Sequence, residues 1–191
     1  MDAKIPLQIH RLMPERWNDF DKLFGSHGGC GGCWCMYWKL ARKDFQANQG
    51  EGNKLLQKKI VESGSSPGLL AYIDGYPVGW MALEPRENYP VLARSRVLKP
   101  VDKKQVTSIT CFFVDRKFRN TGVSTALIKE AVNLSRQSDG IILEGYPIDT
   151  LDQRLPAPFV YTGLVSSFIQ AGFKEEIRRS PKRPIMRCYL K

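Results

Sequence analysis

The chain has 191 residues, of which 42% are hydrophobic, and its formal net charge is +10 at pH 7. That length suits one well-buried domain over residues 1–191 and is short for two. No apolar run approaches the roughly 20 residues that a membrane helix needs, and the N-terminus lacks the apolar core of a signal peptide, so we expect a soluble, cytoplasmic protein with no membrane partner. The basic residues lie in short, scattered clusters, which favours a solvated surface over a nucleic-acid site.

The first third of the chain predicts one strand and two helices. Residues Ile5–Leu12 alternate apolar and polar side chains, as a half-buried strand does. Pro14 then opens a helix that runs to Gly25, because proline suits the first helical turn and apolar residues follow at helical spacing. Residues 53–63 predict a second helix of the same apolar spacing.

A glycine- and cysteine-rich loop lies between these two helices. Cys30, Cys33 and Cys35, together with His27, are ligands of the kind that zinc prefers, but one nine-residue loop would have to wrap the metal alone, whereas structural zinc sites usually recruit two separated pairs. A Cys-x-x-Cys redox pair is a second alternative. Five cysteines, an odd number, argue against a disulfide framework, so we predict free thiols and no metal.

The middle of the chain predicts a hairpin and a central strand. Gly68–Ile73 and Val78–Leu83 read as strands joined by a tight Asp-Gly turn. Residues 84–104 read as a long polar connection with three prolines. Thr107–Val114 is apolar on both faces, which is typical of a strand covered on two sides.

A short loop then leads from this strand into a helix that runs from Val123 to Arg136. Gly122 lets the chain turn and lets a ligand approach the backbone. The unpaired amides that begin the helix attract a phosphate, and the basic residues around Arg119 strengthen the attraction. An ordinary turn capped by Asn120 or Thr121 is the alternative.

The last part of the chain predicts the rest of the sheet. Ile141–Leu143 reads as a strand parallel to its predecessor, because a helix connects the two. Residues 147–158 read as a loop, Leu164–Ala171 as a helix that Gly172-Phe173 closes, and two final strands follow. The resulting order is β-α-α-β-β-β-α-β-α-β-β.

The loop Arg119-Asn120-Thr121-Gly122-Val123-Ser124 resembles the R/Q-x-x-G-x-G/A signature that binds pyrophosphate in the GNAT superfamily of acyl-CoA-dependent N-acetyltransferases. Ser124 departs from the usual final Gly or Ala. The order of elements and the Gly172-Phe173 pair are similar to the family as well, so the resemblance covers almost the whole chain. It implies an α/β fold with a mixed, mostly antiparallel twisted sheet, in which a central parallel pair of strands splays apart between flanking helices.

The same resemblance implies acetyl-CoA as cosubstrate and assigns residues to it. The backbone of the central strand would line the pantetheine arm, the loop would hold the pyrophosphate, and the cysteine-rich segment would wall the acceptor pocket. The residues expected to bind the cosubstrate are Phe112, Phe113, Val114, Arg119, Asn120, Thr121, Gly122, Val123, Ser124 and Phe168. Those expected in the acceptor pocket are Trp34, Tyr37, Trp38 and Tyr146, for which simple core packing is the alternative.

Acetyl transfer needs a base for the amine, a donor for the thioester oxygen and a leaving thiolate. A carboxylate suits the first task, and the candidates are Glu84 and Glu144, each of which could instead be a solvated charge at a strand end. A backbone N–H of the central strand suits the second. Many relatives place a tyrosine four residues before the final glycine to protonate the thiolate. Phe168 stands at that position here, so the acid is absent or has moved to Tyr161 or Tyr146.

The resemblance therefore implies an N-acetyltransferase that acts on a primary amine of a small molecule or peptide, by direct attack in a ternary complex. We expect a monomer or homodimer. A sensor that binds acyl-CoA without turnover is one alternative, and a basic nucleic-acid-binding protein is another. The sequence does not identify the acceptor.

Overall fold

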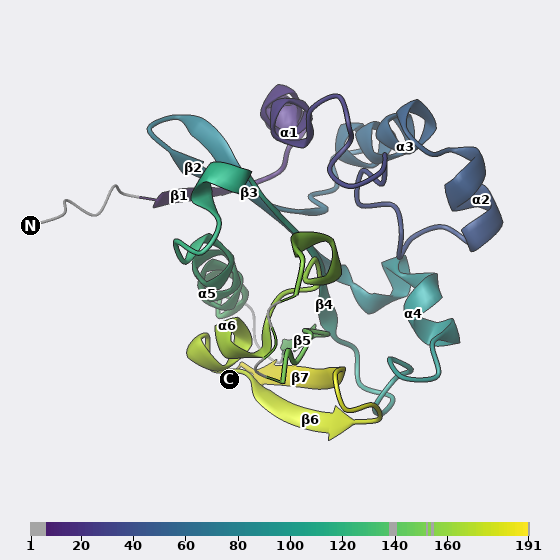
Figure 1. The fold of residues 1–191 in the computed structure, drawn as a ribbon, viewed down its shortest axis with the longest axis vertical. Coiled ribbons are helices and arrows are strands. Elements are labelled where there is room, and N and C mark those ends of the chain that lie inside the picture. The colour runs from purple at the N-terminus through teal and green to yellow at the C-terminus, as the bar shows by residue number, and fades with distance from the viewer. Residues whose placement is uncertain (1–6, 138–140, 152, 154, 191) are drawn as a thin grey trace, which may run out of the picture.

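A mixed seven-stranded sheet runs through the protein in a computed structural model that describes residues 7–137, 141–151, 153 and 155–190 (Figure 1). Neighbouring strands of the described sheet pair antiparallel except β4 and β5, which pair parallel at its centre. The mixed fold with a central parallel pair is thereby confirmed. In spatial order the strands are β1 (Leu7–Arg11), β2 (Gly68–Ile73), β3 (Tyr76–Pro85), β4 (Thr107–Val114), β5 (Ile142–Gly145), β7 (Pro184–Tyr189) and β6 (Lys174–Arg178).

Helices cover both faces of the sheet (Figure 1). The α-helices are α1 (Trp17–Phe24), α2 (Arg42–Ala47), α3 (Glu51–Glu62), α4 (Pro90–Arg94), α5 (Val123–Ser135) and α6 (Val165–Gln170). The 3-10 helices among the described residues are η1 (Pro14–Arg16), η2 (Arg86–Asn88), η3 (Arg116–Phe118) and η4 (Ala157–Phe159). Apolar side chains of α5 and α6 pack on one face, and those of α1 and the cysteine-rich loop pack on the other. In the described ranges, no helix combines the length and apolarity needed to cross a membrane.

Two sequence predictions were wrong in detail. Pro14 opens a 3-10 turn, and the α-helix begins only at Trp17. The supposed polar connection 84–104 contains the end of β3, then η2 and α4, and its Tyr89 and Leu92 are fully buried in a third apolar cluster. The apolar residues of this stretch come in short groups separated by prolines and charged residues, so no helical or strand period extends over it. Ile5, the expected start of the first strand, lies outside the described residues.

The sheet forks between β4 and β5. Their pairing covers only three register positions, from Thr107 with Leu143 to Ile109 with Gly145, while β4 continues to Val114. On its other edge β4 bulges against β3, because Ala82 pairs with Cys111 and the next residue of β3 pairs with Ile109. A bulge re-aims the strand locally. The part of β4 beyond the bulge therefore presents its backbone to the fork.

Candidate active site

The loop before α5 forms an open helix N-terminus. Gly122 is the residue that precedes the helix, its φ is 88°, and no side chain caps the helix there. Neither Asn120 nor Thr121 acts as its cap, since the Thr121 hydroxyl instead donates to the carbonyl of Phe118 at 2.7 Å. A side chain built at Gly122 would meet no atom within 4 Å. Space and free donors thus coincide at the start of a 13-residue helix.

Basic side chains surround this opening. Arg116, Lys117 and Arg119 are all exposed. The Arg119 Nε atom donates to the Val114 carbonyl at 3.0 Å, which ties the loop to the end of β4. Val123 is buried and Ser124 is half-buried, so the helix that follows is anchored. A pyrophosphate fits the charge and the donors of this corner.

At the fork, the Phe112 amide has an acceptor within the chain. Its N–H donates to the carbonyl of Tyr161 at 2.6 Å. The Phe112 ring packs on the α5 and α6 side, whereas the Phe113 ring lies 5.1 Å from Phe24 on the opposite side. The Phe112 edge of the strand faces the fork, where a peptide group of the same chain bonds its amide. That Phe112, Phe113 and Val114 line the pantetheine arm stays a prediction.

A buried polar row crosses the sheet beside the fork. Glu84, Ser108, Glu144 and Arg187 are register partners on β3, β4, β5 and β7. Directly paired residues of neighbouring strands point to the same face of a sheet. Their exposed fractions are 6%, 0%, 0% and 2%. The suggestion that either glutamate is a solvated strand-end charge was therefore wrong.

Glu144 is held by three donors. Its Oε1 accepts from Arg86 Nη1 at 2.6 Å and from the Tyr146 hydroxyl at 2.7 Å, and its Oε2 accepts from Arg187 Nε at 2.7 Å. Asp102 holds the other end of Arg187 at 2.8 and 3.2 Å, and this hydrogen bonding lowers the pKa of Asp102 to about 2. Two carboxylates thus face two guanidinium groups, so the centre is electrically balanced.

Glu84 lies in a smaller cluster. It pairs with Lys39, whose side chain is equally buried, and it accepts hydrogen bonds from the Tyr89 hydroxyl at 3.2 Å and from Asn88 Nδ2 at 3.1 Å. The Lys39 ammonium also lies 5.6 Å from the centre of the Tyr89 ring. Burial, followed by the charge of Glu84, raises the pKa of Tyr89. Glu84 thus has three donors and a donor on each oxygen, as Glu144 does, but it keeps a small exposed surface that Glu144 lacks.

Three aromatic side chains lie together, one of them that of Tyr161, whose carbonyl bonds to β4. Tyr37 is nearly perpendicular to Trp38 and to Tyr161, at 5.0 and 6.2 Å between ring centres, while Trp38 and Tyr161 are inclined by only 28° at 6.5 Å. The buried Nε1 of Trp38 has no hydrogen-bond partner among the described residues. Trp34 does not join them, because it stacks on Phe24 at 5.4 Å in the core.

The two tyrosines considered as acids are poorly suited to that role. Burial raises the pKa of Tyr161 and of Tyr146 above the ordinary value. A phenol of raised pKa gives its proton less readily to a thiolate, whose acid has a pKa of roughly 8.5. Tyr146 is also committed to Glu144, and its hydroxyl lies 2.7 Å from Ser108 Oγ. Phe168 is fully buried and carries no proton to donate.

The cysteine-rich loop does not gather its thiols. Cys30 is exposed, Cys33 is half-buried, and Cys35 is buried, where its sulfur accepts a hydrogen bond from Trp80 Nε1 at 2.9 Å. Burial raises the pKa of Cys33 to about 11, which disfavours the reactive thiolate. Over the ranges that the structure describes, no group of three or more His, Cys, Asp or Glu side chains could hold a metal ion.

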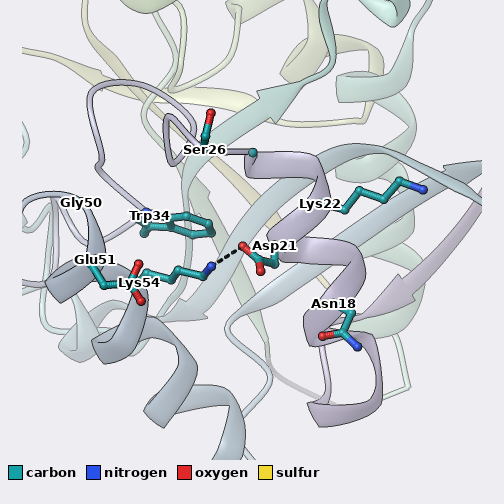
Figure 2. Close-up of a pocket in the computed structure, with 9 residues that line it drawn as sticks. Asn18, Asp21, Lys22, Ser26, Trp34, Gly50, Glu51 and Lys54 are labelled. Carbon is teal, nitrogen blue, oxygen red and sulfur yellow. Dashed lines mark ion pairs between the residues drawn. The ribbon is translucent and has the colours of Figure 1, made fainter.

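A hollow of about 440 Å³ lies between α1, the cysteine-rich loop and α3 (Figure 2). Inside it, Lys54 pairs with Asp21 at 2.7 Å and lies 5.1 Å from the centre of the Trp34 ring. Trp34 is the one predicted site residue on its wall. The charges of Lys54 and Asp21 neutralise each other, and the hollow lies away from the fork. It is therefore not assigned to the active site.

Sequence reasoning missed several residues of the polar centre. They are Lys39, Arg86, Asp102, Ser108 and Arg187. A signal existed for two of them, since a serine and an arginine interrupt strands that are otherwise apolar. Burial of a polar group without a partner is costly, so these interruptions indicated a buried network.

The fork in the parallel pair, together with the open helix N-terminus beside it, defines an acyl-CoA-dependent acyltransferase architecture. The acetyltransferase (GNAT) family profile matches residues 34–150. The chain belongs to this family.

Solved structures agree at the level of the fold. A GNAT-family acetyltransferase from Listeria monocytogenes aligns with a TM-score of 0.57 and 13% identity, over 100% of this chain and 98% of the other. One from Streptococcus agalactiae gives 0.55 and 11%, over 97% and 96%. The PaiA N-acetyltransferase from Thermoplasma acidophilum, solved with coenzyme A, gives 0.51 and 15%, over 96% and 99%. No curated protein matches the chain.

Proposed function

We propose that this protein moves an acetyl group from acetyl-CoA to a primary amine of a small molecule or peptide, by direct attack within a ternary complex. The observation that carries the proposal is the uncapped start of α5, with open space at Gly122 and basic side chains around it, beside the fork of β4 and β5. Family membership supports acyl-CoA-dependent acetyl transfer in general. The choice of an amine acceptor is the proposal.

The cosubstrate would be held mainly by backbone groups. Amides of residues 122–124 at the start of α5 would bind the pyrophosphate, with Arg116, Lys117 and Arg119 as charged neighbours. The free edge of β4 would bind the pantetheine arm, and acetyl-CoA would supply the thioester. The Phe112 N–H is the donor best placed for the thioester oxygen, since β4 presents it beyond the bulge.

Glu84 is the base we assign. An alkylamine has a pKa of roughly 10 and must lose a proton before or during attack. Glu84 keeps a carboxylate among Lys39, Tyr89 and Asn88, next to the segment that carries the aromatic cluster. Glu144, which lies between two guanidinium groups and has no exposed surface, is better suited to holding Arg86 and Arg187 in place.

The reaction can then be completed without an acidic side chain of the protein. The amine nitrogen bonds to the acetyl carbon, the carbon–sulfur bond breaks, and the amine proton passes to Glu84 directly or through water. The thiolate leaves unassisted, because a thiol with a pKa of roughly 8.5 is an adequate leaving group near neutral pH. Phe168 in place of a tyrosine is compatible with this course.

The acceptor amine would lie against the rings of Tyr37 and Trp38. Aromatic faces attract an ammonium group within about 6 Å of the ring centre. The unpartnered Nε1 of Trp38 is a donor that a carbonyl oxygen of the acceptor would satisfy. An amine next to a carbonyl, as in an amino-acid amide or a peptide N-terminus, meets both conditions.

Calorimetry with coenzyme A, followed by a screen of amines, amino-acid amides and peptides with acetyl-CoA, tests the proposal. We expect heat from binding and release of free thiol with a subset of the acceptors. Binding without thiol release from any acceptor would favour the acyl-CoA sensor instead. Absence of any binding heat would overturn the cosubstrate assignment altogether.

A further inference from the structure

The fork that would receive the pantetheine arm already holds a piece of the chain. We infer that residues 161–164 are an internal occupant of this slot, which acyl-CoA must displace, and that the displacement uncovers the aromatic acceptor pocket. The inference rests on the proposed function, because it names what the cosubstrate has to move. It goes beyond that function by coupling the two binding sites through one segment.

Hydrogen bonds fix the segment on both of its edges. Towards β4, the Tyr161 carbonyl accepts from the Phe112 N–H at 2.6 Å. On the other edge, Leu164 forms a parallel bridge with Ile148, whose N–H donates to the Gly163 carbonyl at 2.9 Å. The segment therefore lies between β4 and the chain that continues from β5, in the manner of a short additional strand.

We infer that the fork has room for only one extended chain. Neighbouring strands lie about 4.7–4.9 Å apart, so one inserted strand separates its two neighbours by about 10 Å. A pantetheine arm is itself a single extended chain. The arm and residues 161–164 therefore compete for the same room and for the same Phe112 amide.

The Tyr161 carbonyl also imitates the group that it would exclude. It is a carbonyl oxygen bound to the amide that we assign to the thioester oxygen. Both groups are neutral carbonyls before the reaction, so they compete for the same N–H donor. The contacts that acyl-CoA makes elsewhere, at the start of α5, would drive the exchange.

Displacement of residues 161–164 would also change the aromatic pocket proposed for the acceptor amine. The Tyr161 ring covers Trp38 and Tyr37 at 6.5 and 6.2 Å between ring centres. When the Tyr161 peptide leaves Phe112, its ring cannot keep this position. The face of Trp38 then becomes available to an amine, so acyl-CoA binding prepares the acceptor pocket.

Hydrogen–deuterium exchange of the wild-type protein, with and without coenzyme A, tests the displacement. The Ile148 N–H donates to the Gly163 carbonyl, and the N–H of Val165, the next residue after the segment, donates to the Ile148 carbonyl. We expect these two amides to exchange faster when coenzyme A is bound, while the start of α5 becomes protected. Protection at α5 with unchanged or slower exchange at residues 148 and 165 would overturn the inference and leave the proposed function standing. No protection at α5 would instead remove the proposed function.

A pair of glycine variants tests the competition. Gly163 and Gly64 both have positive φ, of 87° and 85°, but only a side chain at Gly163 would press on Phe112 and Phe168, each at 2.9 Å. Gly163→Ala should loosen the internal occupant. If the open state holds about a tenth of the wild-type population, coenzyme A should bind Gly163→Ala up to about tenfold more tightly.

Gly64→Ala strains the backbone in the same way, but its side chain would meet no neighbouring atom. It should leave the affinity for coenzyme A within about twofold of wild type. Equal affinities of the two variants for coenzyme A would contradict the competition.

Acrylamide quenching of tryptophan fluorescence adds a measurement that does not depend on either variant. Coenzyme A should increase the quenching of wild-type fluorescence, and Trp38→Phe should lose that increase; an increase of the same size in Trp38→Phe would show that Trp38 is not uncovered.

Discussion

Two polar centres lie beside the fork, and they are built in opposite ways. The first, at the start of α5, consists of backbone donors from a few consecutive residues and is open to solvent. The second, around Glu144, consists of charged side chains from β5, β7, η2 and the chain near Asp102, and it is enclosed except at the exposed Asp102. The open centre depends on the shape of the backbone. The enclosed one depends on the balance of charge.

This difference fits the proposed division between a binding site and a structural support. Backbone amides at an open helix end are unpaired donors that suit an anion. A buried set of ion pairs has its donors and acceptors used, and it fixes the strands that carry them. We therefore expect charge-changing variants to affect the enclosed centre through stability, and shape-changing variants to affect the open centre through binding.

The largest effect should follow Glu144→Ala. It leaves Arg187, which is 2% exposed, and Arg86 without their shared partner. Breaking a buried pair on one side costs about 3–5 kcal/mol of unfolding free energy. Urea denaturation measures this loss.

The matched control is Glu62→Ala, which removes an exposed helical pair with Lys58 at 3.7 Å and should change stability by about 0.5 kcal/mol or less. If Glu144→Ala cost no more than the control, the enclosed centre would not stabilise the fold.

Glu84→Gln should lower turnover about a hundredfold, which is the lower end of general-base contributions. The loss should be greatest at low pH, where most of the acceptor amine is protonated and depends on a base. Steady-state rates across pH 6 to 9, with an acceptor from the screen, measure it.

Glu87→Gln, three residues along and exposed, should behave as wild type. A pH profile of Glu84→Gln parallel to that of wild type would remove Glu84 as the base.

Gly122→Val should weaken coenzyme A binding about tenfold. A β-branched residue in the left-handed conformation costs roughly 1–2 kcal/mol, and its side chain would fill the space that the phosphates need. Calorimetry measures the affinity. Gly64→Val imposes the same backbone cost at the end of α3 and should bind normally; similar losses in both would point to general destabilisation.

The smallest effect concerns Asp102. Its pKa is about 2 in the folded protein, because of Arg187, against roughly 3.9 when unfolded. A lowered folded pKa stabilises the protein above about pH 4, and the contribution disappears as the pH falls towards 2. The difference in urea midpoint between wild type and Asp102→Asn should therefore be present at pH 7 and vanish near pH 2. A difference independent of pH would show that the carboxylate charge is not responsible.

The sequence predicted best what is encoded by neighbouring residues. The strands, α5 and the loop around Gly122 follow from local period and turn chemistry, and the structure contains them. The charged centre could not be predicted in the same way, since Arg86, Asp102 and Arg187 are far apart in the chain and meet only when the strands pair.

The aromatic segment shows a different limit. Trp34 and Trp38 looked equivalent in sequence, but Trp34 and Cys35 both have positive φ, of 43° and 57°, which reverses the chain between them. Trp34 consequently turns into the core, while Trp38 packs beside Tyr161 and the third apolar cluster. Non-glycine residues rarely adopt this conformation, so no sequence pattern indicated it.

The packing of Phe168 against Gly145 has a consequence for sequence variation among relatives. A side chain at position 145 would collide with the Phe168 ring, which also contacts Gly163. Positions 145 and 168 are therefore not free to drift independently. Relatives with a phenylalanine at the second position should keep glycine at the first, and an alanine there should coincide with a smaller residue in the helix.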